Sequence, residues 1–173
     1  MRLDINEGTR EMDNKTLPAD SQKFNKAVTI NASTSQVWHI LTTPGLMRKW
    51  MMPDDVEINI STDWEVGSPM VIRGNMNGRN FENNGTVLKF EPEKTLEYSH
   101  LSSMSRLPDQ PESYSIIEFG LQPMEDLTVL TLTISNFPTE SIYKHLAFYW
   151  NVTLEVLKRM IENKPINKIS STA

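Results

Sequence analysis

The side chains that most often carry out chemistry are sparse in this sequence of 173 residues. There is no cysteine, which excludes disulfides and thiol catalysis and fits a reducing compartment. The three histidines, His39, His100 and His145, do not have the spacing of a zinc site. No Ser-His-Asp arrangement, close pair of acids or nucleotide-binding glycine motif is evident. The sequence therefore predicts no catalytic residue, no metal and no cofactor.

His100 is the histidine of most functional interest, because it shares strand parity with Leu96 and Tyr98. If those two side chains face the interior, His100 faces it too and could orient a ligand or exchange a proton. The alternative is that His100 lies at a strand end, in water and without a role. Glu118 is the only acid in an apolar strand, and the opposite parity of its neighbours predicts that it faces solvent.

The chain is expected to divide into three segments. Residues 1–22 contain no aromatic and few aliphatic side chains, so they bury too little apolar surface to offset the entropy of ordering. Residues 164–173 form a polar tail after a helix stop at Pro165. We therefore expect two flexible ends around one domain at 23–163, which is a usual domain size.

Short elements open this domain. Residues 23–31 alternate apolar and polar side chains, as a strand does. Ser33-Thr-Ser-Gln36 matches a helix capping box, and the helix that it starts must end before Pro44. A second short helix is expected over Gly45–Trp50.

Strand patterns fill residues 56–135. Asn77-Gly78 is a preferred two-residue hairpin turn, whereas Asn84-Gly85 lies inside a longer strand and suggests a bulge. The other connections are also short, and parallel strands would need long crossovers. The pattern predicts an antiparallel meander.

One long helix is predicted after the strands. From Thr139, a suitable N-cap, no helix breaker occurs before Pro165. About 24 residues make a helix roughly 36 Å long, enough to cross a sheet. An amphipathic helix needs one apolar face to cover, so we expect an α+β fold with a curved antiparallel sheet around this helix. The residues expected to face the sheet are Leu146, Tyr149, Thr153 and Leu157.

Several local motifs follow one another in a specific order. They are Val28-Thr-Ile30-Asn-Ala-Ser33, Val37-Trp38 with Leu41-Thr42-x-Pro44, Trp50, Asp63-Trp64-x-Val66-Gly67-x-Pro69, Gly85-x-Val87-Leu88 with Glu91-Pro92, and Tyr149-Trp150. In this order they make residues 23–163 resemble the START-like (SRPBCC) superfamily. The branch that they resemble is homologous to the C-terminal domain of the activator of heat-shock protein 90 ATPase.

This resemblance implies the helix-grip fold of the birch-pollen-allergen-like proteins, with two short helices after strand 1 and a cavity between sheet and helix. It implies no shared catalytic apparatus, because the superfamily uses one fold for transport, sensing, cyclisation and co-chaperone work. Aromatic side chains are typical of pockets for apolar ligands, although several must simply fill the core. The residues expected to line a ligand pocket are Trp38, Tyr98, His100, Phe119, Leu132, Tyr149 and Trp150.

Charge and hydropathy restrict the partners. The net charge is −5 with both signs spread along the chain, and no basic stripe offers itself to phosphates, so we expect no nucleic-acid or membrane partner. No stretch approaches the roughly 20 apolar residues of a membrane span, and the N-terminus lacks the apolar core of a secretory signal. These features predict a cytoplasmic protein.

Three functions are compatible with the sequence. The first is non-catalytic binding of a small hydrophobic ligand between the sheet and the C-terminal helix. The second is a co-chaperone-like interaction with a chaperone or another protein, as in a stress response. The third is an enzyme of the cyclase or hydrolase type, although no pair of residues suggests a catalytic role.

Overall fold

The computed structural model describes residues 23–163, and the expected flexible ends, residues 1–22 and 164–173, lie outside them. Three α-helices and seven strands make up the described part. The helices are α1 (Thr34–Thr42), α2 (Pro44–Met51) and α3 (Glu140–Glu162). The strands are β1 (Lys23–Ile30), β2 (Ile58–Ser61), β3 (Pro69–Met76), β4 (Arg79–Glu91), β5 (Thr95–Ser102), β6 (Ser115–Met124) and β7 (Leu127–Ser135).

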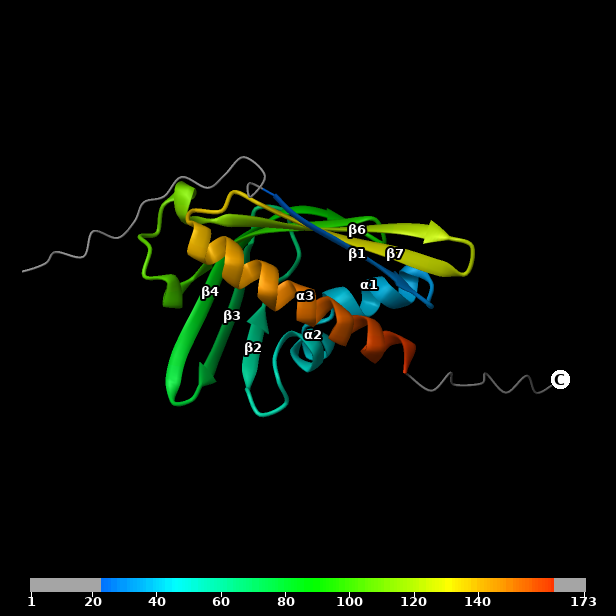
Figure 1. Cartoon of the computed structure of the whole chain (residues 1–173), viewed down its shortest axis with the longest axis horizontal. Helices are drawn as coiled ribbons and strands as arrows, with labels where there is room; N and C mark the ends of the chain where they lie inside the picture. The colour runs from blue at the N-terminus through cyan, green and yellow to red at the C-terminus, as the bar shows by residue number, and fades with distance from the viewer. Residues whose placement is uncertain (1–22, 164–173) are drawn as a thin grey trace, which may run out of the picture.

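The seven strands form one antiparallel sheet in the order β1-β7-β6-β5-β4-β3-β2. The meander from β2 to β7 is therefore sequential, and β1 pairs with β7 to extend the sheet at its far edge. In Figure 1 the strands β2, β3 and β4 descend at a steep angle to β1, β6 and β7, so the sheet is strongly curved. The long helix α3 crosses its inner side, and α1 and α2 lie on that same side. This arrangement confirms the predicted helix-grip fold.

The predicted starts of α1 and α3 are confirmed, whereas α2 begins at Pro44, just before the predicted Gly45. Ser33 and Gln36 form the capping box of α1, with each side chain accepting from the other residue's backbone N–H. Pro44 occupies the first turn of α2, where its missing N–H costs nothing. The Thr139 hydroxyl accepts from the backbone N–H of Ile142 at the start of α3.

The hairpin between β3 and β4 is also confirmed. Asn77 and Gly78 both have positive φ, 53° and 78°, which is the geometry of a type I′ turn. The predicted bulge at Asn84-Gly85 is wrong, because the register of β4 against β5 shifts between Val87 and Lys89.

Gly85 serves a different purpose from the expected bulge. A Cβ atom at this position would overlap the backbone carbonyl of Ser99 on β5, lying 2.8 Å from its carbon. The glycine is therefore required for the close approach of two strands, which is the other common reason for glycine within a strand.

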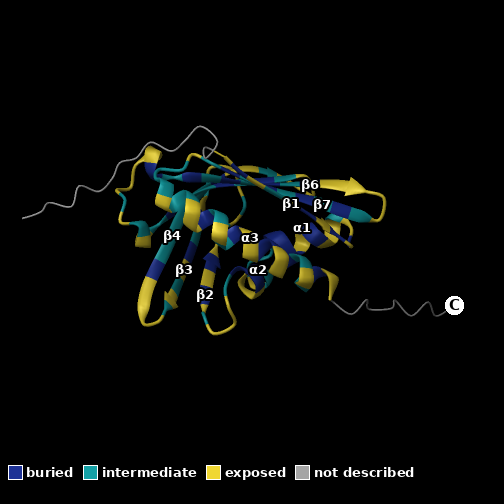
Figure 2. Ribbon diagram, in the orientation of Figure 1, coloured by how far each residue is buried: buried dark blue, intermediate teal, exposed yellow. Residues whose placement is uncertain are grey.

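Burial alternates along the strands, so that one face of the sheet packs against α3 (Figure 2). The orientation of α3 differs from the expected one. Trp150, which the helical spacing placed at the flank, is only 2% exposed and lies at the centre of the buried face. Tyr149, expected to face the sheet, is half-buried, whereas Leu146, Thr153 and Leu157 are buried as predicted.

Candidate functional site

A cavity of about 420 Å³ lies between the N-terminal half of α3 and strands β2 to β6. Ligand pockets in proteins have volumes of roughly 300–1,000 Å³. The apolar side chains that line it are Met51, Met52, Ile58, Ile72, Met76, Phe81, Tyr98, Leu101, Met104, Ile117, Ile142, Leu146, Tyr149 and Trp150. The polar ones are Asn83, His100, Ser102, Ser105, Ser113, Ser115, Ser141 and His145.

The mouth of the cavity can be located from exposure. Met104, Ser141 and His145 are the exposed residues of the lining, and they come from the turn after β5 and the first turns of α3. Because these two segments are adjacent in the fold, the cavity opens to solvent between them. This is the region of the 102–111 loop that follows β5.

Four of the seven residues expected at a pocket line this cavity, namely Tyr98, His100, Tyr149 and Trp150. Tyr98 and His100 project from β5 with the same parity, which is the alternation noted in the sequence. His100 is therefore part of the cavity wall. It does not lie in solvent at a strand end, which was the alternative. Burial, and to a lesser degree nearby His145, lowers the pKa of His100 to about 4, so its ring is neutral at pH 7.

The two tyrosines at the cavity are also neutral. Burial raises the pKa of Tyr149 to about 12, and its hydroxyl donates to the backbone oxygen of Met51 at the end of α2. Burial also raises the pKa of Tyr98, with Tyr149 adding to the effect. The hydrogen bond from Tyr149 joins α3 to α2 and so fixes the width of the cavity at this end.

The other three expected residues, Trp38, Phe119 and Leu132, are not part of the lining. The Trp38 ring packs against that of Phe90 on β4, with the two ring centroids 5.2 Å apart. Phe119 makes an edge contact with Trp150 at 5.4 Å, and Leu132 is fully buried in β7. Here the helices fill the concave face completely, so the inward-facing side chains pack against each other.

The lining also contains methionines and serines that are not among the seven expected residues. Flexible, polarizable methionines such as Met51 and Met52 suit an adaptable apolar surface. Five serines come from residues 102–141, four of them from the connection between β5 and β6 and its flanks. Their abundance in that connection was the one available signal, but serine is too common in loops to indicate a pocket.

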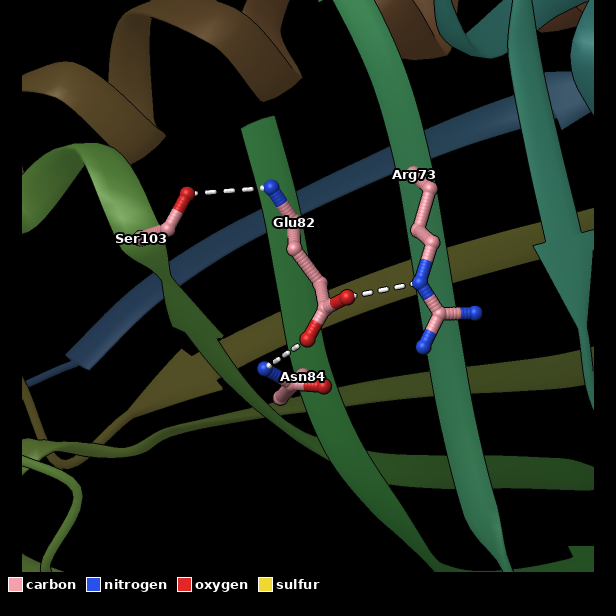
Figure 3. A network of polar contacts seen from close by, with 4 residues as sticks. All are labelled: Arg73, Glu82, Asn84 and Ser103. Atoms are coloured by element: carbon pink, nitrogen blue, oxygen red, sulfur yellow. Dashed lines mark hydrogen bonds and ion pairs between the residues drawn. The ribbon is translucent and has the colours of Figure 1, made fainter. Parts of the chain in front are cut away.

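A polar network supports the cavity wall from outside (Figure 3). Glu82, on the outer side of β4, accepts from Arg73 at 2.6 Å and from the Asn84 amide at 2.8 Å. The hydroxyl of Ser103 accepts from the backbone N–H of Glu82, which ties the turn after β5 to β4. Hydrogen bonds from Asn84 and Arg73 lower the pKa of Glu82, so the network keeps its charge at neutral pH. It holds the turn that carries the cavity residues Ser102, Met104 and Ser105.

One pair of acids escaped the sequence analysis. Glu97 on β5 and Glu118 on β6 are directly opposite each other on the outer face of the sheet. Burial, and then the hydrogen bond and charge of Glu118, raise the pKa of Glu97. Glu118 was expected to face solvent, but it is only half-exposed and lies beside another acid. The pair lies away from the cavity.

A larger hollow of about 930 Å³ lies between α2, the segment that follows it and strands β2 to β4. Its lining mixes cations such as Arg48 and Lys49 with acids such as Asp54 and Glu57. Such a mixture of charges is typical of a solvated surface. The inner cavity is the better candidate site, because its wall is mostly apolar with a few convergent polar groups.

A curved antiparallel sheet that grips one long helix, with a cavity between them, defines a START-like domain. The sequence model of the family "Activator of Hsp90 ATPase homolog 1-like protein" matches residues 31–162. The chain therefore belongs to this family. Among curated protein sequences, none gives a significant match.

Solved structures agree with the family. A protein from Cytophaga hutchinsonii is 33% identical, with a TM-score of 0.69 over 82% of this chain and 94% of that chain. The solution structure of the Aha1 dimer from Colwellia psychrerythraea is 28% identical, with a TM-score of 0.62 over 82% of this chain and 96% of that one. A Chromobacterium violaceum protein, 17% identical, shares the fold with a TM-score of 0.71 over 83% and 99% of the two chains.

Within residues 23–163, no helix combines the length and the apolar character that crossing a membrane requires.

Proposed function

We propose that this protein binds a small, mostly apolar molecule in the cavity between α3 and the sheet, without transforming it chemically. The observation that carries the proposal is the cavity itself. The cavity stays open although aromatic rings pack against each other in the neighbouring core. Of its 22 lining residues, 14 are apolar or aromatic. An empty apolar cavity forfeits dispersion contacts with its own walls, so a ligand that fills it would stabilise the fold.

The expected affinity follows from the buried area. A ligand that buries roughly 300 Å² of apolar surface would gain about 7 kcal/mol before the cost of association is subtracted. A dissociation constant of 1 μM corresponds to about 8 kcal/mol, so we expect micromolar or weaker binding from the apolar contacts alone. Hydrogen bonds at the polar groups of the wall would have to supply anything tighter.

The test is a titration with the neutral dye N-phenyl-1-naphthylamine, whose fluorescence rises in apolar surroundings. Met76 lines the cavity from the end of β3 and is half-buried. The substitution Met76→Trp should fill part of the space and weaken dye binding at least 10-fold. Met124→Trp is the matched control, since Met124 is exposed at the end of β6 and outside the lining. Absence of saturable binding, or equal binding by both variants, would refute the proposal.

A second candidate function is protein interaction, and one observation favours it. Phe148, Val152 and Val156 are 74%, 53% and 39% exposed and recur every four residues along α3, so they form an apolar row on its outer side. The family carries the name of an ATPase activator, and one similar solved structure is a dimer. A co-chaperone-like role, with a chaperone or a second copy of the chain as partner, would use such a row.

This second function can be tested separately from ligand binding. Phe148→Glu introduces a charge into the row without touching the cavity. If the row binds a partner, this variant should abolish self-association in sedimentation experiments, or stimulation of Hsp90 ATPase activity, and leave dye binding intact. Asn151→Glu is a control at an exposed position of α3 outside the row and outside the cavity lining. A wild-type protein that neither associates nor stimulates the ATPase would exclude this function.

A further inference from the structure

The polar residues of the cavity are concentrated where β5, β6 and the start of α3 meet. His100 on β5 is directly opposite Ser115 on β6, and Asn83 on β4 is directly opposite Ser102. The remaining polar residues of the lining come from the turns between β5 and β6 and from the first two turns of α3. The wall on the side of α2, β2 and β3 is apolar. The cavity therefore has one polar end and one apolar end.

Two serines at the polar end belong to the cavity wall. Ser113 and Ser115 are 4% and 1% exposed, and both line the cavity. A serine hydroxyl can donate one hydrogen bond and accept others. Both side chains can therefore bond a polar group of a molecule inside the cavity.

Asn83 supplies an unpaired group at the same end, although buried polar side chains are usually paired in native proteins. Its side-chain oxygen Oδ1 is buried without a hydrogen-bond partner, the only such atom found within the described residues. The three groups offer hydroxyl donors, hydroxyl acceptors and an amide. A ligand group that can both donate and accept a hydrogen bond would match this set.

The electrostatics of the wall restrict the charge of that group. Of the described residues that line the cavity, none is Asp, Glu, Lys or Arg. His100 is held neutral at pH 7 by its burial, which lowers its pKa to about 4. The other histidine of the lining, His145, lies at the exposed mouth. A carboxylate or an ammonium beside the buried serines would thus have no opposite charge next to it to compensate for its lost hydration. The site disfavours both kinds of ion.

We propose that the cavity selects neutral amphipathic molecules, with an apolar body against α2, β2 and β3 and a terminal hydroxyl hydrogen-bonded to Ser113 and Ser115. This inference rests on the proposed ligand-binding function and narrows it to the class of neutral alcohols. The cavity has the liquid volume of about 14 water molecules, which suits a ligand of on the order of ten to twenty non-hydrogen atoms.

The experiment compares four probes of similar apolar length by displacement of N-phenyl-1-naphthylamine from the full chain at pH 7. The probes are 1-decanol, 1-methoxynonane, decanoate and decylammonium, each kept below its solubility limit. 1-Methoxynonane has the same number of non-hydrogen atoms as 1-decanol but cannot donate a hydrogen bond. One neutral hydrogen bond corresponds to between about 2-fold and 12-fold in affinity, so 1-decanol should bind about 5-fold tighter than the ether. Both ions should bind at least about 10-fold more weakly than 1-decanol.

The assignment to the two serines is tested by the double variant Ser113→Ala and Ser115→Ala. These changes remove only the hydroxyls, so the fold is retained, as the melting temperature will verify. The preference for 1-decanol over the ether should fall below about 2-fold, while dye binding is unchanged. Ser61→Ala, at an exposed position of β2 outside the cavity, should keep the preference.

The outcomes separate this inference from the function on which it rests. If the dye does not bind at all, both are refuted. If the dye binds but an ion matches 1-decanol, or the double variant keeps the full preference for the alcohol, ligand binding stands and the neutral-alcohol inference is overturned.

Discussion

The substitution Gly85→Ala tests the close approach of β4 and β5, which forms the wall that carries His100. The new methyl group would overlap the backbone carbonyl of Ser99, and a backbone group cannot rotate away as a side chain can. The two strands would have to separate by on the order of 1 Å, beyond hydrogen-bonding range. The bond from the Thr86 backbone N–H to the Ser99 hydroxyl, 2.9 Å long, would be lost together with neighbouring bonds of the ladder.

The magnitude follows from counting these bonds. About three hydrogen bonds at roughly 1 kcal/mol each amount to a loss of about 3 kcal/mol in the free energy of unfolding. For a domain of this size that corresponds to a fall of about 6–12 °C in the melting temperature. Thermal unfolding followed by circular dichroism measures it directly, and dye titration should show a parallel loss of binding, since the cavity wall is displaced.

Gly120→Ala on the adjacent strand β6 is the matched control. A Cβ there would meet no atom within 4 Å, apart from its chain neighbours. Replacing such a glycine by alanine restricts the unfolded chain and should leave stability unchanged or raise it by less than about 1 kcal/mol. Equal melting temperatures for the Gly85 and Gly120 variants would refute the reasoning, because the predicted steric conflict would then not exist.

Two further substitutions test features outside the cavity. Folding raises the pKa of Glu97, chiefly through burial and then through Glu118. The protonated Glu97 side chain therefore stabilises the fold at acid pH, and this stabilisation is lost as the pH rises through the folded-state pKa. Glu97→Gln should therefore raise the melting temperature at pH 7 but not at pH 4, and an equal shift at both values would contradict the assignment. Trp64→Phe removes the indole N–H that donates to the Thr42 backbone oxygen at 2.7 Å but keeps a ring to stack on Phe90, so it should cost about 1–2 kcal/mol in chemical denaturation. A change below 0.5 kcal/mol would show that water replaces the lost donor.

The elements with local signals were predictable from the sequence. The Ser33–Gln36 capping box, the Asn77-Gly78 turn and the Thr139 N-cap each act over a few residues, so their physics is complete within the segment that contains them. Alternation along β5 likewise brought Tyr98 and His100 to the same face. These local preferences agree with one another, and that agreement makes the fold itself readable.

The composition of the candidate site was predictable only in part. The side chains of Tyr98, Phe119 and Leu132 are all on the buried face of their strands, but of these three only Tyr98 lines the cavity. What separates them is the distance between sheet and helices at each point. That distance depends on the curvature of the whole sheet, which no local pattern encodes.

The sequence alone determined which segments become strands and helices, and through motif order it determined the family. The tertiary structure alone decided that Trp150 rather than Tyr149 occupies the centre of the buried helix face, and that Glu97 meets Glu118. It also decided that two buried serines, 113 and 115, line an open cavity, and that the side-chain oxygen of Asn83 is buried without a partner. The physical reason is the range of the interactions. Capping, turns and alternation are settled between near neighbours in the chain, whereas register, helix rotation and cavities are settled by packing between segments that are far apart in sequence.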